Sequence, residues 1–308
     1  MPNTRIMIVG GSYMQLDVCV TRLAEPGECV TDPGGISYSP SGSIARCGTA
    51  LSAFGAECIA VTKLGADLNG QKLYSFYKES GMNTSFVKVD REFQTGLYLN
   101  IREGNGSSRA TKFPGANEQL TAENVSEAFV SSPAAVYLDL DADEAIIDRS
   151  ARLAASRQIP VFLNLSPAKQ IKAESLPPID FAICDEGDLL TYTGERPGGT
   201  QETLRATFAL WRKLRAKYLV IRQGERGAMV FDGKRCEVIN PCVAEKGYEY
   251  SEDRELIFGA AFTAEFIRVR DVKFAAKYAV AAVATPIPAR GKFPTDEAVR
   301  GTMKRNRY

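Results

Sequence analysis

Strand and helix patterns alternate along the second half of the chain, and this alternation constrains the fold more than any other feature of the sequence. Short apolar runs typical of buried strands occur at residues 135–140, 161–164, 181–184 and 218–221, and helical apolar spacing lies between them at 144–157 and 203–216. Strands that alternate with helices in this way form a parallel sheet covered on both faces. We therefore expect an α/β fold whose ligands bind at the carboxyl ends of the strands.

The first half of the chain begins in a similar way. Residues 5–9 read as a buried strand, and 16–20 as its continuation after Gly10-Gly11-Ser12. Next, we expect a helix at 43–54 closed by Gly55, a strand at 57–61, a turn at 63–70, and a helix at 71–80 that ends at Gly81.

Two other stretches have strand character without helices between them. Residues 25–41 are rich in Pro, Gly and Ser, which favours loops and short strands. Residues 84–113 include strand patterns at 96–101 and 109–113, separated by a turn at 103–107. Together these stretches could form a small sheet that stands apart from the main body. After residue 221 we expect a hairpin around Asp232-Gly233 and helices at 256–270 and 272–284.

Composition excludes several classes of function. A net charge of +1 with no Lys/Arg-rich run gives no electrostatic case for nucleic acid or membrane binding. The absence of histidine excludes Ser-His and Cys-His catalysis and His-ligated metals. Seven cysteines without a CxxC pair are typical of reduced thiols, and the first apolar run stops at Gly10-Gly11, so we expect a cytoplasmic protein without signal peptide or membrane span.

Six short motifs follow one another along the chain in a characteristic order. They are Gly10-Gly11-Ser12 with Asp17, the run 39–46 leading to Ala53-Phe54-Gly55, the run 63–70, Pro114-Gly-Ala-Asn117, the run 222–228, and Phe293-Pro-Thr295. In this order and spacing they resemble the pfkB/ribokinase family of carbohydrate kinases, from about residue 5 to 300. The resemblance implies a ribokinase-like, Rossmann-like fold: one domain over 1–308 with a mostly parallel sheet, helices on both faces, and a small β-sheet lid.

The same resemblance implies what the domain does and how it assembles. The lid would be formed by about 14–41 and 94–113, would cover the sugar, and often serves as the interface of a homodimer. The family reaction is the phosphorylation of a sugar hydroxyl by ATP with Mg²⁺. Small-molecule ligands, a sugar or a nucleoside-like compound, are therefore the expected partners.

The stretch 253–262 is where the family's catalytic turn would lie. The family has a Gly-Ala-Gly-Asp turn at a helix start, which holds the developing phosphate charge and whose Asp takes the hydroxyl proton. Ungapped alignment puts Ala260 at the place of that Asp. Gly259 keeps the freedom that such a turn needs, whereas Ile257 and Phe258 are bulky. Asp253 lies about 10 Å upstream along a helix and could act as the base only if the loop refolds.

The sugar side of the predicted site also departs from the family. Gly42 keeps a family glycine, but Arg46 stands where an Asn is expected. An arginine favours carboxylate or phosphate partners, so it would suit an anionic ligand; a charge on a helix surface is the alternative. Asp17 and Asp141 stand where the family places acids on sugar hydroxyls, although either could be an ordinary surface acid.

On the nucleotide side, the family's Asn-Glu-x-Glu motif, which organises Mg²⁺ through water, is replaced by Asp185-Glu-Gly-Asp188. Asp185 and Asp188 could still serve a hard cation, or could simply be a charge cluster at a helix N-terminus. Gly224 and Gly227 would let the backbone approach a nucleotide beside Arg222, or would only form a hairpin turn.

The last nucleotide-facing segment, residues 278–295, is shorter than the family's. It has Val280 where an Asn is usual, and Pro286 and Pro288 would reshape the loop near the adenine.

These departures gather in the proposed site, whereas the closest matches build the fold. The first hypothesis is accordingly a sugar-kinase homologue whose phosphoryl transfer is weak or lost. A second is a working kinase with an unorthodox site that uses Asp253 or an acid of 185–188. A third is a non-catalytic pseudokinase, a ligand-binding or partner subunit that pairs through the lid.

Overall fold

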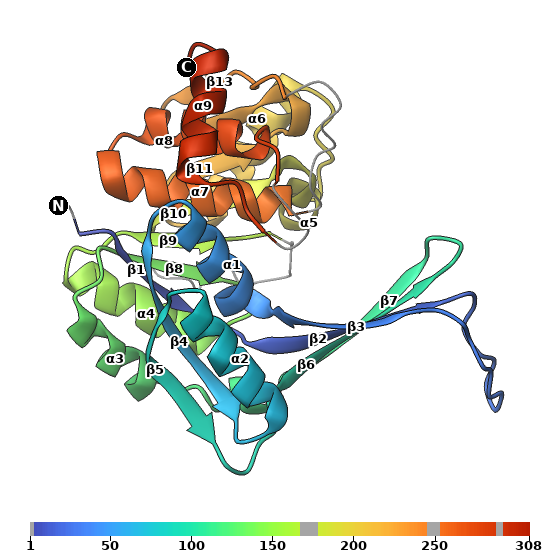
Figure 1. The fold of residues 1–308 in the computed structure, drawn as a ribbon. Helices are drawn as coiled ribbons and strands as arrows, with labels where there is room; N and C mark the ends of the chain where they lie inside the picture. Colours follow the sequence, from blue (N-terminus) through green and yellow to red (C-terminus); the bar gives the residue numbers. More distant parts are fainter. Residues whose placement is uncertain (1–2, 167–177, 245–252, 288–291) are drawn as a thin grey trace.

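The computed structural model describes residues 3–166, 178–244, 253–287 and 292–308. Its largest element is a nine-stranded sheet with the order β13-β12-β11-β10-β9-β8-β1-β4-β5 (Figure 1). The strands are β1 (Arg5–Val9), β4 (Glu57–Gly65), β5 (Asn83–Asp90), β8 (Ala135–Asp139), β9 (Val161–Asn164), β10 (Ile179–Asp185), β11 (Ala216–Arg222), β12 (Ala228–Phe231) and β13 (Cys236–Ile239). All neighbours from β5 to β11 are parallel, and β12 and β13 are antiparallel. The expected α/β fold and the hairpin after residue 231 are confirmed.

Helices cover both faces of this sheet because its strands are apolar on both sides. Along β1, Ile6 and Ile8 point to one face, and Met7 and Val9 point to the other. The first face packs against α1 (Gly42–Ala53), α2 (Leu68–Glu79), α7 (Arg254–Val269), α8 (Val272–Val283) and α9 (Asp296–Arg305). The second packs against α3 (Ala122–Ala128), α4 (Glu144–Ser156), α5 (Leu189–Thr193) and α6 (Thr200–Lys213).

A second, four-stranded sheet projects from the main body (Figure 1). Its order is β3-β2-β6-β7, with β2 (Tyr13–Val20), β3 (Ile36–Ser41), β6 (Gly96–Glu103) and β7 (Ser108–Phe113). The prediction that residues 16–20 continue the first strand was wrong, because β2 turns away after Gly10-Gly11 and pairs with β6 in this second sheet. Conversely, β5 belongs to the large sheet, where it pairs with β4.

The predicted turn at 63–70 was also wrong. β4 continues to Gly65, and α2 begins at Leu68, three residues earlier than expected from the sequence. Asp67 sets this start, because its side chain accepts a hydrogen bond of 2.7 Å from the Gly70 backbone N–H and so caps the helix. Helix α6 likewise begins and ends three residues earlier than predicted, and α3, α5 and α9 were not predicted.

The strand order places a topological switch point between β1 and β8. From β1 the chain proceeds outward through β4 and β5, whereas β8, β9, β10 and β11 follow one another in the opposite direction. In open parallel sheets ligands bind at the carboxyl ends of the strands beside such a point. The carboxyl ends of β1 and β8 are therefore the first place to look for a site.

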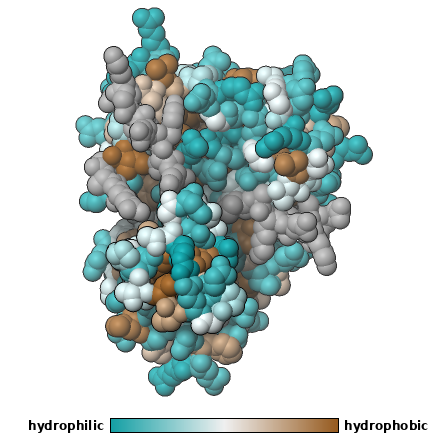
Figure 2. Space-filling view, turned by 90° about the vertical axis from the view of Figure 1, so that its right-hand side faces the viewer, coloured by the Kyte–Doolittle hydropathy of each residue, from teal (hydrophilic) through white to brown (hydrophobic). Residues whose placement is uncertain are grey.

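The surface on the side toward which the second sheet projects is mainly hydrophilic, with small, separate hydrophobic spots (Figure 2). Within the described ranges, no helix is both long enough and apolar enough to cross a membrane.

Candidate active site

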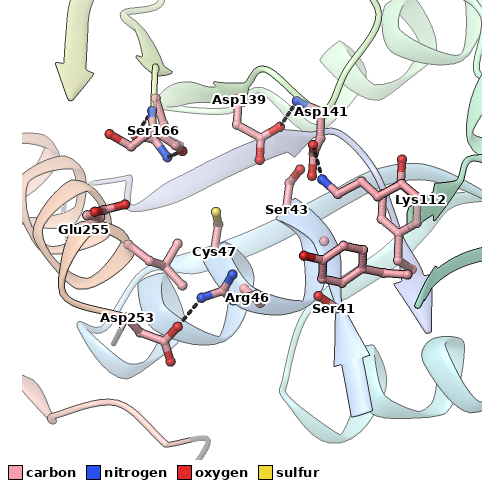
Figure 3. A pocket seen from close by; sticks show the side chains of 15 residues that line it. Ser41, Ser43, Arg46, Cys47, Lys112, Asp139, Asp141, Ser166, Asp253 and Glu255 are labelled. Atoms are coloured by element: carbon pink, nitrogen blue, oxygen red, sulfur yellow. Dashed lines mark hydrogen bonds and ion pairs between the residues drawn. The ribbon is translucent and has the colours of Figure 1, made fainter. Parts of the chain in front are cut away.

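A cavity of about 180 Å³ lies at the switch point. Its walls come from the second sheet, from the first turns of α1 and α7, and from the segments that follow β8 and β9 (Figure 3). The residues that line it are Tyr13, Ser41, Gly42, Ser43, Arg46, Cys47, Tyr98, Lys112, Asp139, Asp141, Asn164, Ser166, Asp253, Glu255 and Leu256. At about 30 Å³ per water molecule in the liquid, this volume suits a ligand of monosaccharide size.

Gly42 begins α1 at the edge of the cavity with a φ of +85°, in the region that favours glycine. A side chain there would collide with the carbonyl oxygen of Gly11. Gly10 is needed for a similar reason, because a Cβ at this position would collide with the Ser43 side chain. The two glycines therefore let the end of β1 and the start of α1 pack closely together.

Arg46 points from α1 toward the start of α7, where it forms an ion pair with Asp253 (Figure 3). The carboxylate partner that an arginine favours is thus supplied by the chain itself. Asp253, the acid that the sequence suggested as a substitute base, is therefore already bound to Arg46. Both side chains are about half-exposed at the rim of the cavity.

Asp139, the last residue of β8, and Asp141, two residues after it, face the cavity (Figure 3). The backbone N–H of Asp141 donates to Asp139 Oδ1 at 3.0 Å, and Lys112 Nζ of β7 donates to Asp141 Oδ1 at 2.6 Å. Burial at the bottom of the cavity, reinforced by the charge of Asp141, raises the pKa of Asp139 to about 7. Sequence reasoning selected Asp141 and missed Asp139, although its place at the end of a strand beside the switch point could have marked it.

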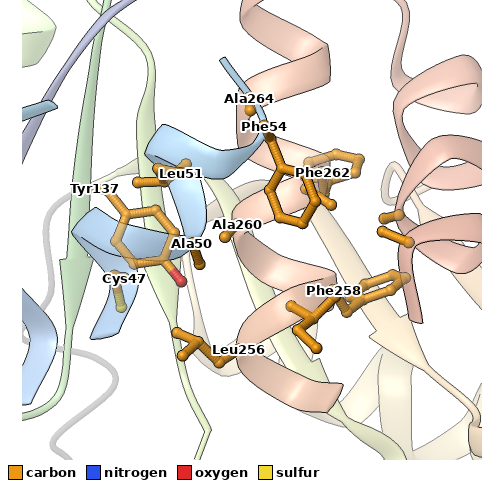
Figure 4. Close-up of a cluster of buried hydrophobic side chains, with 14 of the residues drawn as sticks. Cys47, Ala50, Leu51, Phe54, Tyr137, Leu256, Phe258, Ala260, Phe262 and Ala264 are labelled. Atoms are coloured by element: carbon orange, nitrogen blue, oxygen red, sulfur yellow. The ribbon is translucent and has the colours of Figure 1, made fainter. Parts of the chain in front are cut away.

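The residues expected to form the catalytic turn lie inside α7. The Ile257 N–H donates to the Asp253 carbonyl at 2.9 Å, so the helix is already formed there. Ile257, Phe258 and Ala260 are buried in the core, and Ala260 faces α1 beside Ala50 and Leu51 (Figure 4). The helix expected at 256–270 is thereby confirmed, with its start two residues earlier at Arg254, and the residues at the position of the family's turn are helical.

Gly259 serves close packing rather than a turn. Its φ is not positive, and a Cβ at this position would lie 3.1 Å from Tyr137 Oη.

The residues that the sequence suggested for the nucleotide and its metal form ion pairs and hydrogen bonds within the protein. Arg222 Nε donates to Asp185 Oδ1 at 2.5 Å, and a second guanidinium nitrogen pairs with Oδ2. Both side chains are nearly buried, and burial raises the pKa of Asp185 to about 7, with Arg222 acting in the opposite direction and Glu255 in the same one. Asp188 accepts hydrogen bonds from the Ser166 hydroxyl and the Asp185 N–H. Both carboxylates thus take part in contacts within the protein, and their role toward a metal stays a prediction.

Gly224 and Gly227 line a separate, much smaller cavity of about 20 Å³ together with Arg222, Phe258 and Val280. This volume holds about one water molecule. Of the two prolines predicted to reshape the adjoining loop, Pro286 is described, and Pro288 lies outside the described residues.

Asp17 lies on β2 of the second sheet and not among the residues that line the larger cavity. It accepts hydrogen bonds from Asn100 at 2.7 Å and Gln15 at 2.9 Å.

Comparison with known proteins decides the family. The model of the "pfkB family carbohydrate kinase" matches residues 3–248. The chain belongs to this family.

Among curated relatives of this pfkB chain, a ribokinase of Bacillus subtilis (strain 168) is 24% identical over 302 residues, which cover 96% of the chain and 97% of the relative. Among solved structures, Arabidopsis thaliana ribokinase complexed with ribose and ATP has a TM-score of 0.83 at 18% identity, covering 99% of both chains. Ribokinase from Cryptococcus neoformans in complex with ADP has a TM-score of 0.82 at 15% identity, covering 97% of this chain and 99% of its own. The ribokinase-like fold is thereby confirmed.

The larger cavity of this pfkB chain is lined by groups that suit the binding of a polar ligand. It has hydroxyls, carboxylates and aromatic rings that can hold a polyol. It has no acid at position 260, and the N–H groups that would hold a developing phosphate charge lie within a helix.

Proposed function

We propose that this pfkB-family chain binds a monosaccharide-sized ligand in the larger cavity and that its phosphoryl transfer to a sugar hydroxyl is weak or lost. The observation that carries the proposal is the burial of Ala260 inside α7. A general base must come within hydrogen-bond reach of the proton, and losing it costs about 3–5 kcal/mol in barrier. Loss of the anion-holding turn adds about 3 kcal/mol, by analogy with a lost oxyanion donor.

ATP and Mg²⁺ are the family's phosphoryl donor and metal, and the proposal is that this chain holds them poorly. Phe258 and Val280 narrow the cavity beside Gly224 and Gly227. Arg222 neutralises Asp185, the first acid of the segment that would organise the metal.

The four-stranded sheet is proposed to act as the lid of the single ribokinase-like domain and as the interface of a homodimer in the cytoplasm. It contributes Tyr13, Tyr98 and Lys112 to the cavity. It also exposes apolar side chains, with Ile36, Tyr38 and Phe113 each more than half exposed. Burying such residues against a second copy would stabilise the pair.

The alternative of a working kinase with an unorthodox site has one observation in its favour. Asp139 lines the cavity with a pKa of about 7, near the value that suits a general base at neutral pH. The third possibility is a pseudokinase that acts only as a partner subunit. The exposed apolar side chains of the four-stranded sheet are the one observation that supports it.

Calorimetric titration with MgATP, and with a non-hydrolysable analogue, tests the proposal together with a coupled-assay screen of sugars. We expect binding of one or more sugars, nucleotide binding weaker than millimolar, and turnover at least about 10³-fold below that of an active ribokinase assayed alongside. Micromolar nucleotide binding with ordinary turnover would establish the working kinase instead. Failure of every sugar to bind would overturn the proposed ligand site.

A further inference from the structure

The lining of the larger cavity is acidic. Four carboxylates face it, from Asp139, Asp141, Asp253 and Glu255, against the two cations of Arg46 and Lys112. Each of these cations already forms an ion pair with one of the carboxylates. A ligand therefore meets a surplus of negative charge, which disfavours an anionic sugar and favours a cationic one.

The mouth of the cavity already holds an ammonium group, that of Lys112. Its Nζ lies 2.6 Å from Asp141 Oδ1, 5.4 Å from the centre of the Tyr13 ring and 5.6 Å from that of Tyr98. Aromatic faces and a carboxylate are the groups that recognise ammonium ions in proteins. The chain's own lysine thus demonstrates how the walls of this cavity contact a cation.

The deep end of the cavity offers two further acceptors, Ser43 and Asp139, which point toward each other (Figure 3). Ser43 is 4% exposed, and its hydroxyl lies near enough to the Asp139 carboxyl to lower the pKa of that group by hydrogen bonding. No lysine or arginine in the described ranges forms an ion pair with Asp139. A buried carboxyl beside a hydroxyl, without a cation paired to it, is costly to desolvate, so an ammonium group of a ligand that contacts both would stabilise it.

We propose that this cavity selects sugars or polyols that carry an amine, with Asp139 and Ser43 accepting hydrogen bonds from the ligand's ammonium group. The inference rests on the proposed function, because it names the chemical class of the ligand for that same site. The N-terminus of α1 also faces the cavity, and its partial positive charge would attract an anion. The negative charge of Asp139, which lies beside it, opposes this attraction.

Calorimetric titration with two matched series at pH 7.5 tests the selectivity. One series is glucosamine, glucose and gluconate, and the other is iminoribitol, ribose and ribonate, so that each contains a cation, a neutral sugar and an anion. In at least one series we expect the cation to bind about tenfold or more tighter than the neutral sugar, and the anion to bind about tenfold or more weaker. Charge-assisted hydrogen bonds account for a difference of this size.

Three variants assign the effect to the deep end of the cavity. Asp139→Asn should bring the cation-to-neutral affinity ratio close to one, and Ser43→Ala should lower it about threefold. Glu144→Gln removes an exposed acid from the next helix and should leave the ratio unchanged, which separates a local contact from general charge. Circular dichroism and thermal unfolding establish that each variant is folded.

Two results of these titrations would overturn the inference. A neutral sugar that binds as tightly as its amine analogue, or an acid that binds more tightly, would overturn the inference while leaving the proposed sugar site intact. Binding by none of the six compounds also overturns it, and the wider sugar screen then decides separately whether the proposed function stands. An unchanged ratio in Asp139→Asn would place the selectivity elsewhere.

Discussion

The guanidinium of Arg46 and the carboxylate of Asp253 form an ion pair although the two residues lie 207 positions apart in the sequence. The pair joins the first half of α1 to the residue that precedes α7, at the rim of the larger cavity. It couples two residues that the sequence had suggested for separate roles, one on the sugar and one as a base. The contribution of this pair to the free energy of unfolding can be measured directly.

A double-mutant cycle of Arg46→Met and Asp253→Asn should give a coupling free energy of no more than about 1 kcal/mol. The side chains are 48% and 34% exposed, and ion pairs in such positions contribute little because water competes with them. Urea unfolding of the four proteins provides the measurement. A coupling above about 2 kcal/mol would show that the pair is a structural clamp.

The Arg222–Asp185 pair should behave differently because its side chains are only 8% and 14% exposed. Arg222→Met leaves the Asp185 carboxylate buried beside Glu255, and we expect it to lower the free energy of unfolding by about 3–5 kcal/mol. Arg226→Met is the matched control: Arg226 pairs with the neighbouring Glu186 but is 43% exposed, so its loss should cost less than about 1 kcal/mol. Equal effects of the two substitutions in urea unfolding would refute this account.

Introducing an acid at position 260, where the resemblance to the family places one, tests whether this buried position can hold a carboxyl group. Ala260→Asp places a carboxyl group between α7 and α1, where nothing compensates for its lost hydration, and should destabilise the protein by about 3 kcal/mol or more. We expect no gain in phosphoryl transfer, because the backbone N–H groups around position 260 stay hydrogen-bonded within α7 and cannot hold a phosphate. Position 260 is changed alone, because Ile257 and Phe258 are also buried and truncation of either side chain would cost about 3–5 kcal/mol.

Ala260→Ser serves as the control for side-chain size at this position. A variant Ala260→Asp that is as stable as the parent and gains tenfold or more in the coupled assay would mean that position 260 faces the acceptor. The proposed loss of transfer would then be wrong.

The fold could be predicted from the sequence because apolar periodicity is a local property. The runs around 135–140 and 218–221 identify buried strands regardless of what lies elsewhere in the chain. The order and spacing of the six motifs, which can also be read directly from the sequence, indicated the family. The boundaries that failed, such as the end of β4 at Gly65, depend on a cap and on pairing with a distant strand.

The site was less predictable for a physical reason. A resemblance points only to positions that the family uses, so it suggested Asp141 and passed over Asp139, whose carboxyl the fold buries. It also treated Arg46, Asp185 and Arg222 as free to meet ligands, whereas each has a partner from another part of the chain. Such pairs form only when the tertiary structure brings the partners together, and no local pattern reports them.

Gly42 illustrates a residue whose predicted and observed roles differ in kind. The resemblance assigned it to the sugar, and the structure adds that its φ of +85° and its contact with Gly11 exclude any side chain. Gly42→Ala should therefore cost about 3 kcal/mol or more in unfolding free energy. Gly187→Ala is the control, because a Cβ there meets no atom within 4 Å and should change stability by less than about 1 kcal/mol. Similar melting temperatures for both variants would contradict the requirement for glycine at position 42.

The raised pKa of Asp139 predicts a pH dependence of stability. Burial and the charge of Asp141 raise this pKa to about 7, opposed first by a hydrogen bond from Ser43 and least by Lys112, whereas the carboxyl of the unfolded chain ionises near pH 3.9. Between about pH 4 and 7 the folded state therefore binds more protons than the unfolded state. The stability contributed by this group falls as the pH rises through that window, and stays constant above it.

Asp139→Asn removes the titrating group and should be the more stable protein, relative to the parent, at pH 8 than at pH 5. Urea unfolding of both proteins at pH 5, 6, 7 and 8 measures the difference. Glu144→Gln, at an exposed acid on the neighbouring helix, is the control for the loss of a carboxylate outside the cavity. If the difference between Asp139→Asn and the parent does not change between pH 5 and 8, the predicted pH dependence is wrong, and burial does not raise the pKa of Asp139.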